Sequence, residues 1–249
     1  MIYHRKEVLE LSYGFKIIVE GDYALFTHNA MKVERVSYDV PTVSALEGMI
    51  KSVFWKPPIR YVIDRIVVFN PIKFINVRRN ELKSKIPLSA VKSQMKGVGS
   101  AEIFASEERT QRAGMILKDV KYGIEFHFEL TGLKADHDDE SEEKHYNILL
   151  RRLKNGQCFR QPCLGCREFG VRSIRLVDDF DLSQVDESLN GDIDLGYMLY
   201  RMRFEDGGKP INNNWDSPKF SDKAEPVYYR PHMINGVIDV NKYKEGMRC

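Results

Sequence analysis

The alternation of apolar and polar residues between Val120 and Leu130 constrains the fold most. Apolar side chains occupy every second position there, and the positions between them carry charge, glycine or histidine. Side chains on a strand point alternately to its two faces, so this pattern predicts a strand with one buried face. His127 then lies on the polar face with Glu125 and Glu129. It could be a site histidine or a surface residue paired with a carboxylate. The second interpretation is favoured, since nothing nearby completes a site.

Five further segments are predicted to be regular elements. Thr42 is a suitable N-cap for a helix, and Pro57-Pro58 ends it. Ser141 and Gly156 are the matching start and stop signals of a second helix. The predicted elements are strands at 15–26, 59–70 and 166–177 and helices at 43–54 and 142–155.

The order of these elements predicts the fold class. Strand, helix, strand, insertion, strand, helix and strand is the pattern of an α+β, ferredoxin-like (RNA-recognition-like) βαββαβ domain. We expect an N-terminal extension at 1–14, this domain at 15–182 and a smaller β-rich region at 183–249. The insertion covers about 71–114. Its start is predicted to be a short strand, followed by a partly helical segment and then a loop.

Charge is segregated along the chain although the net charge is only +2. Basic residues dominate 73–118, and Glu168 is the sole acidic residue between 144 and 175. Such segments could form a surface for a polyanion, or solvated faces that never converge. No apolar run approaches the ~18 to 20 residues of a membrane span, and the charged N-terminus does not suit a signal peptide. We expect a cytoplasmic protein with no membrane partner.

An adjacent lysine and histidine, Lys144 and His145, begin the second predicted helix. The field at a helix N-terminus disfavours positive charge. This suits a histidine that exchanges protons near neutral pH. The alternative is that both are ordinary exposed helix residues.

Residues 144–169, KHYNILLRRLKNGQCFRQPCLGCREF, resemble the signature of the CRISPR-associated (Cas) endoribonuclease of type I-C systems. This is the catalytic branch of the fifth Cas family, in the repeat-associated RNA-binding superfamily. Residues 21–57 resemble its N-terminal strand, loop and first helix, and 117–130 resemble its central strand. Together these segments cover most of 15–177, whereas the resemblance is weak after about Asp178.

The resemblance implies a metal-independent endoribonuclease without cofactors. Such proteins cut precursor CRISPR RNA at the repeat hairpin, and attack by the 2′-hydroxyl leaves a 2′,3′-cyclic phosphate. They stay on the 5′ handle of the mature guide RNA, beside the backbone and large subunits of the type I-C surveillance complex. Duplex DNA is a further candidate ligand of the basic segments. Two alternatives stay open: a non-catalytic guide-RNA-binding subunit, and a zinc-stabilised interaction protein.

The family's catalytic set of tyrosine, lysine and histidine maps onto Phe54, Lys144 and His145. His145 can act as acid or base, and Lys144 can neutralise charge that develops on the phosphate. Phe54 departs from the family because it has no hydroxyl. Tyr38 or Tyr61 could supply one instead, or the chain could cleave more slowly. We expect Phe54 to face the RNA and stack on a base.

Four arginines are the candidate RNA contacts, to phosphates or bases, with aromatic stacking nearby. They are Arg151, Arg152, Arg160 and Arg167. The alternative is that the helix arginines only form ion pairs with the acidic runs at 136–143 and 178–194.

Three cysteines close together in sequence do not suggest the disulfide framework of an exported protein. They are Cys158, Cys163 and Cys166, and with His145 they could form a zinc site. The spacing lacks a second Cys-x2-Cys pair, and a ligated His145 could not exchange protons. We therefore expect no metal.

Overall fold

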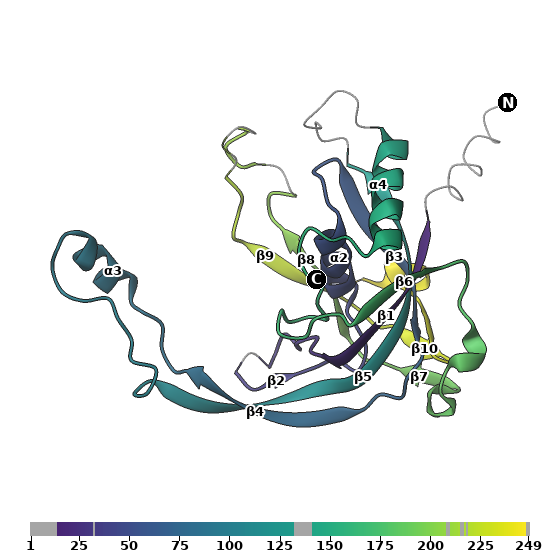
Figure 1. Ribbon diagram of the computed structural model, residues 1–249, viewed down its shortest axis with the longest axis horizontal. Helices are drawn as coiled ribbons and strands as arrows, with labels where there is room; N and C mark the ends of the chain where they lie inside the picture. The colour runs from purple at the N-terminus through teal and green to yellow at the C-terminus, as the bar shows by residue number, and fades with distance from the viewer. Residues whose placement is uncertain are drawn as a thin grey trace.

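The computed structural model is an α+β protein with a mostly antiparallel nine-stranded sheet and few helices (Figure 1). None of the helices among the described residues is long and apolar enough to cross a membrane. The structure describes residues 14–31, 33–131, 141–207, 210–214, 217 and 219–247, with only the backbone of 244–246. The predicted extension at 1–14 therefore lies almost wholly outside the described residues.

Four strands form the centre of the sheet, in the order β6 (Ser173–Val177), β1 (Phe15–Ala24), β5 (Arg109–Leu130) and β3 (Ile59–Val68). All three neighbouring pairs are antiparallel. The strand predicted from the alternating pattern is confirmed, because even-numbered positions from Val120 to Phe128 are buried. The main core cluster joins this face of the sheet to the two longer helices.

Those two helices begin and end where the sequence predicts. Helix α2 is Val43–Val53, and the Thr42 hydroxyl accepts a hydrogen bond from the Ala45 amide at 3.3 Å. Helix α4 is Glu142–Asn155, and the Ser141 hydroxyl accepts from the Lys144 amide at 3.2 Å. It ends at Gly156, whose φ of 63° is easily adopted by glycine.

The insertion is a projecting arm rather than mainly a loop. Strand β4 (Phe74–Leu82) pairs with the first part of β5, and α3 (Leu88–Met95) lies at the tip (Figure 1). The predicted loop is wrong from Arg109 onward, since β5 already begins there. The sequence lacks the alternating signal because both faces of the arm contact solvent, so neither face needs to be apolar. Strand β2 (Arg35–Val36) adds a short parallel pairing to β5.

The predicted strand at 166–177 is wrong in its first part. Only Ser173–Val177 forms β6, and the residues before it make turns that include a bridge between Cys163 and Gly170.

The C-terminal part contributes strands to the same sheet. Strands β11 (Val237–Asp239), β10 (His232–Ile234) and β7 (Asp192–Asp194) continue it beyond β3. Strands β8 (Met198–Phe204) and β9 (Ala224–Tyr229) form a separate two-stranded sheet. Short 3-10 turns complete the region, at Leu182–Gln184, Glu187–Leu189 and Asn241–Gly246. The boundary between 182 and 183 stays a prediction.

Candidate functional site

His145 lies on the core-facing side of α4. Its side chain is only 1% exposed, and it shares this face with Leu149 and Leu153, four and eight residues further along the helix. The interpretation of His145 as an exposed helix residue is therefore wrong. Lys144 precedes it by about 100° around the helix and is half-buried. The two adjacent side chains thus leave the helix in different directions.

Phe54 is the partner that the structure brings to His145. It caps the C-terminus of α2 in an extended conformation, and its ring centroid lies 6.0 Å from that of the imidazole. The ring is 4% exposed and belongs to the core cluster. The expectation that Phe54 stacks openly on a base is not met in this conformation, because most of the ring is covered by protein.

The two tyrosines considered as substitutes are both buried. The Tyr61 hydroxyl donates to the Phe54 carbonyl at 2.8 Å, and burial raises the pKa of Tyr61 well above its ordinary value. Its hydroxyl is thus already hydrogen-bonded to the backbone of Phe54. Tyr38 packs against His28, with ring centroids 4.4 Å apart, and burial raises its pKa as well.

Arg152 connects α4 to the end of α2. Its Nη1 donates to the Val53 carbonyl at 2.6 Å, and its guanidinium carbon lies 5.2 Å from the centre of the Phe54 ring. The carbonyls of a last helical turn have no partner within the helix, and positive charge is favourable there. Arg152 therefore fixes the position of Phe54, whatever else it binds.

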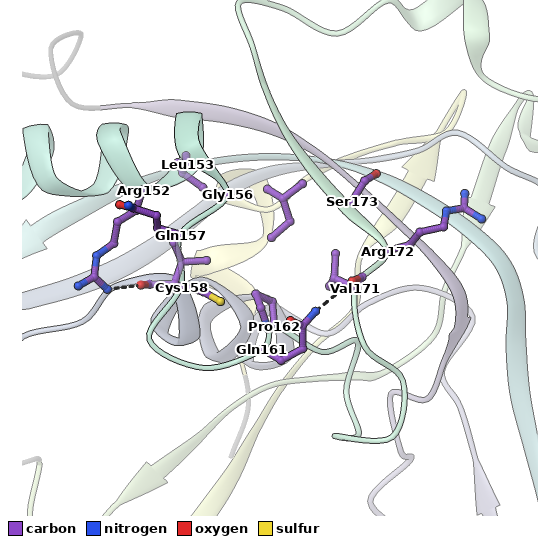
Figure 2. Close-up of a pocket in the computed structure, with 12 residues that line it drawn as sticks. Arg152, Leu153, Gly156, Gln157, Cys158, Gln161, Pro162, Val171, Arg172 and Ser173 are labelled. Carbon is purple, nitrogen blue, oxygen red and sulfur yellow. Dashed lines mark hydrogen bonds between the residues drawn. The ribbon is translucent and has the colours of Figure 1, made fainter.

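Figure 2 shows a pocket of about 200 Å³ beyond this contact, between the end of α4 and the loop that leads to β6. Arg152 and Cys158 stand at one side of it, and Gln161 donates to the Val171 carbonyl at 3.2 Å at the other. This bond holds the loop that follows α4 against the start of β6.

A larger cavity of about 690 Å³ is also lined by Arg152, together with Phe54. We call it the aromatic cavity; it is lined by Lys51, Phe54, Trp55, Lys56, Pro57, Arg152, Phe159 and Arg160. Half of these residues are cationic, and none of the described residues that line it is acidic. Such a lining attracts anions.

The remaining predicted arginines are more scattered. Arg160 lines the aromatic cavity, whereas Arg151 is exposed on α4 and Arg167 is exposed in the loop before β6. His127 forms a 2.7 Å contact with Asp64 and lies 3.9 Å from Glu129, so its interpretation as a carboxylate-paired surface residue is confirmed.

The cysteines are reduced thiols in different surroundings. Cys158 is exposed, whereas Cys163 and Cys166 are half-buried. Burial raises the pKa of the Cys163 thiol, and the Cys166 sulfur accepts from Arg35 at 3.6 Å. Among the residues that the structure describes, no group of three or more His, Cys, Asp or Glu side chains is placed to hold a metal ion.

Of the eight residues that line the cavity, sequence reasoning placed only Phe54, Arg152 and Arg160 in a site. It missed Lys51, Trp55, Lys56, Pro57 and Phe159. A usable signal was present. Trp55-Lys56 and Phe159-Arg160 are both an aromatic residue followed by a cation, just after the end of a helix. Exposed aromatic rings beside cations are typical of surfaces that bind single-stranded nucleic acid.

An α+β fold with a cavity lined by cations and aromatic rings suits a protein that binds nucleic acid. The chain belongs to the family described as CRISPR-associated protein (Cas_Cas5), the Cas5d branch, whose model matches residues 15–241.

Two curated relatives carry the same name, CRISPR pre-crRNA endoribonuclease Cas5d. The chain is 44% identical to the Mannheimia succiniciproducens protein, over 90% of this chain and 93% of the relative. It is 34% identical to the Thermus thermophilus protein, over 92% and 93%.

Two solved structures have a similar fold. One is titled a crystal structure of a CRISPR-associated protein, with a TM-score of 0.57, 25% identity and coverage of 92% of this chain and 91% of that one. The other is the functionally uncharacterized protein SMU1763c from Streptococcus mutans, with a TM-score of 0.58, 26% identity and coverage of 91% of both chains.

Proposed function

We propose that the protein is a metal-independent endoribonuclease that cuts precursor CRISPR RNA at the repeat hairpin. It then stays on the 5′ handle of the guide as a subunit of the type I-C surveillance complex, beside the backbone and large subunits. The names of the two curated relatives support the activity. The observation that carries it is the packing of His145 against Phe54, a residue that lines a cavity rich in cations.

The chemistry follows from the side chains present. Metal-free RNA cleavage needs a 2′-hydroxyl that loses its proton, a stabilised phosphorane and a leaving 5′-oxygen that gains a proton. His145 serves as base or acid, and Lys144 neutralises the developing charge. Because His145 is 1% exposed, RNA binding has to turn the imidazole toward the cavity or displace the Phe54 ring.

The candidate RNA contacts follow the same logic. Arg160 acts from the aromatic cavity, Arg151 from an exposed position on α4, and Arg167 from an exposed position in the loop before β6. Arg152 combines a structural bond to Val53 with a place in the cavity lining, where a phosphate can approach it. These four side chains supply phosphate or base contacts to the repeat RNA.

The finer description of the fold belongs to this proposal. The strand order β6-β1-β5-β3, with α2 after the first of these strands in the chain and α4 after the third, supports a ferredoxin-like, RNA-recognition-like domain. Residues 15–182 form this domain, with the arm as its insertion, and 183–249 form the smaller β-rich region.

A second candidate is a guide-RNA-binding subunit without catalysis. Two observations favour it: Phe54 has no hydroxyl, and His145 is buried. The two candidates differ in whether RNA is cut, but both require binding to the repeat.

One experiment separates them. The protein is incubated with its own repeat RNA in excess chelator, and the products are resolved by length and end group. One discrete cut with a 2′,3′-cyclic phosphate is expected, and a 2′-deoxy substitution at the scissile nucleotide should abolish it. Tight binding without a cut supports the second candidate. Neither binding nor a cut would refute both, and robust cutting of the deoxy substrate would refute the 2′-hydroxyl mechanism.

A further inference from the structure

Two aromatic rings of the aromatic cavity remain largely open to solvent. Trp55 is 50% exposed and Phe159 is 82% exposed, although both border the same cavity as the buried Phe54. Large apolar rings that stay in water carry an unfavourable free energy of hydration. A ligand that covers the two rings recovers this free energy.

The backbone beneath the Phe159 ring is held in place. The Phe159 amide donates to the Ser52 carbonyl at 3.0 Å and to the Val53 carbonyl at 3.3 Å, and the Arg160 amide donates to Ser52 at 3.1 Å. These carbonyls are the unpaired acceptors of the last turn of α2. The loop after α4 is thus tied to the helix end that carries Phe54 and Trp55, so the exposed ring stands on a fixed backbone.

Cations surround the two rings. Lys51 lies in the last turn of α2, Lys56 follows Trp55, and Arg160 follows Phe159. The acidic residue one turn before Lys51 is Glu47, which is buried and forms a 2.9 Å ion pair with Arg201. The carboxylate nearest to this end of α2 in sequence is therefore already paired with another cation.

We propose that the aromatic cavity binds one unpaired nucleotide of the RNA. The base stacks on Trp55 or Phe159, and Lys51, Lys56 and Arg160 contact the flanking phosphates. Stacking needs a flat π-face, and a phosphate needs positive charge, and the cavity presents both within about 690 Å³. This inference rests on the proposed function, because it places the nucleotide against Phe54, the ring that packs on His145.

The first test uses Trp55→Ala, Phe159→Ala and the double variant. Each single change should weaken binding of the repeat RNA about 5- to 100-fold, the usual worth of one stacked base. Phe159→Tyr, which keeps the flat ring, should restore affinity. Phe220→Ala is the matched control, since Phe220 is 51% exposed but does not line the cavity. Circular dichroism of each variant checks the fold.

The second test uses unmodified protein and an abasic scan. The base is removed from each unpaired repeat nucleotide in turn, so no variant has to fold. One position should lose affinity about as much as Trp55→Ala or Phe159→Ala does. In the double variant, the same abasic RNA should lose nothing further, because the partner of the base is already gone.

Failure of the inference and failure of the proposed function look different. If the unmodified protein cuts its repeat while the variants and the abasic scan leave affinity unchanged, the inference is overturned and the cavity is open to a protein partner instead. If the protein does not cut, but a short single-stranded oligoribonucleotide binds in a way that depends on Trp55 and Phe159, the inference stands and catalysis fails. If that oligoribonucleotide binds equally well to the double variant, the inference is overturned in this case too.

Discussion

The aromatic cavity and a second cavity near β8 both combine arginines with aromatic rings, but their arginines have different partners. The second cavity, which we call the C-terminal cavity, has a volume of about 540 Å³. It is lined by Arg60, Val62, Glu129, Tyr200, Arg201, Arg203, Val227 and Met247. Each of its three arginines forms an ion pair, at 2.5 Å to Glu129, 2.9 Å to Glu47 and 3.1 Å to Glu225.

The difference shows that residue type alone does not identify a polyanion site. An arginine held by a carboxylate has to give up that partner before it can bind a phosphate, which opposes binding. In the aromatic cavity, Arg152 is instead held by a neutral carbonyl, so its positive charge is not cancelled. We therefore expect RNA at the aromatic cavity and a structural role for the C-terminal cavity.

The largest expected effect concerns the histidines near the two cavities. His145→Ala should lower the single-turnover cleavage rate by roughly 10²- to 10⁴-fold, the usual worth of a general acid or base. RNA affinity should change little, because His145 is buried and does not line the cavity where phosphates are expected to bind. His127→Ala is the matched control, since His127 pairs with Asp64 beside the C-terminal cavity. Impaired cutting in His127→Ala, with normal cutting in His145→Ala, would reverse the assignment.

A pair of double variants compares the cations directly. Lys51→Ala/Arg160→Ala should weaken repeat binding about 10-fold or more. It should also reduce the slope of log affinity against log salt by about 1.4, which corresponds to two lost contacts to single-stranded phosphates. Arg60→Ala/Arg203→Ala removes the same charge at the C-terminal cavity and should leave the slope nearly unchanged. Binding titrations over a range of salt measure both, and equal slopes for the two variants would remove the distinction between the cavities.

For the stability of the fold, we expect the C-terminal cavity to matter more than the aromatic cavity. Arg201→Met should lower the free energy of unfolding by about 1–3 kcal/mol at neutral pH, because it leaves the Glu47 carboxylate buried without its partner. Burial already raises the pKa of Glu47, and loss of Arg201 raises it further. A carboxyl whose folded pKa is raised costs stability when it is ionised, so the deficit should shrink as pH falls through that pKa. Thermal unfolding between acidic and neutral pH tests this, and a constant deficit would contradict it.

The smallest expected effect is that of Phe54→Tyr. The ring lines the aromatic cavity and contacts His145, so an added hydroxyl that reaches the cavity should raise the cleavage rate by less than about 10-fold. If the hydroxyl instead points into the core, it stays unsatisfied at a cost of about 1–3 kcal/mol. Cleavage rate and thermal midpoint are measured together. A slower and less stable variant would show that Phe54 is purely a core residue.

Sequence patterns predicted the parts of the fold that bury one face and carry local capping signals. Helix α2 with Thr42 and helix α4 with Ser141 are examples, as is the buried half of β5. The arm was found only in part, as a short strand and a partly helical segment. Its pairing with β5 was missed because a strand pair with two exposed faces needs no apolar period. In the site, His145 was found, but its burial against Phe54 was not, because it depends on how α4 packs on α2. The loop that brings Phe159 to Ser52 has no periodic signal at all.

The pairing within the arm determines how its length can vary. Strands β4 and β5 keep one unbroken register from Phe74 opposite Leu117 to Leu82 opposite Arg109. If one residue is removed from each strand, the side chains between the deletion and the tip of the arm change faces relative to the rest of the sheet. If two residues are removed from each strand, these side chains keep their faces. Length variants of this arm should therefore be viable in steps of two residues per strand. Each such step would draw α3 about 7 Å closer to the sheet.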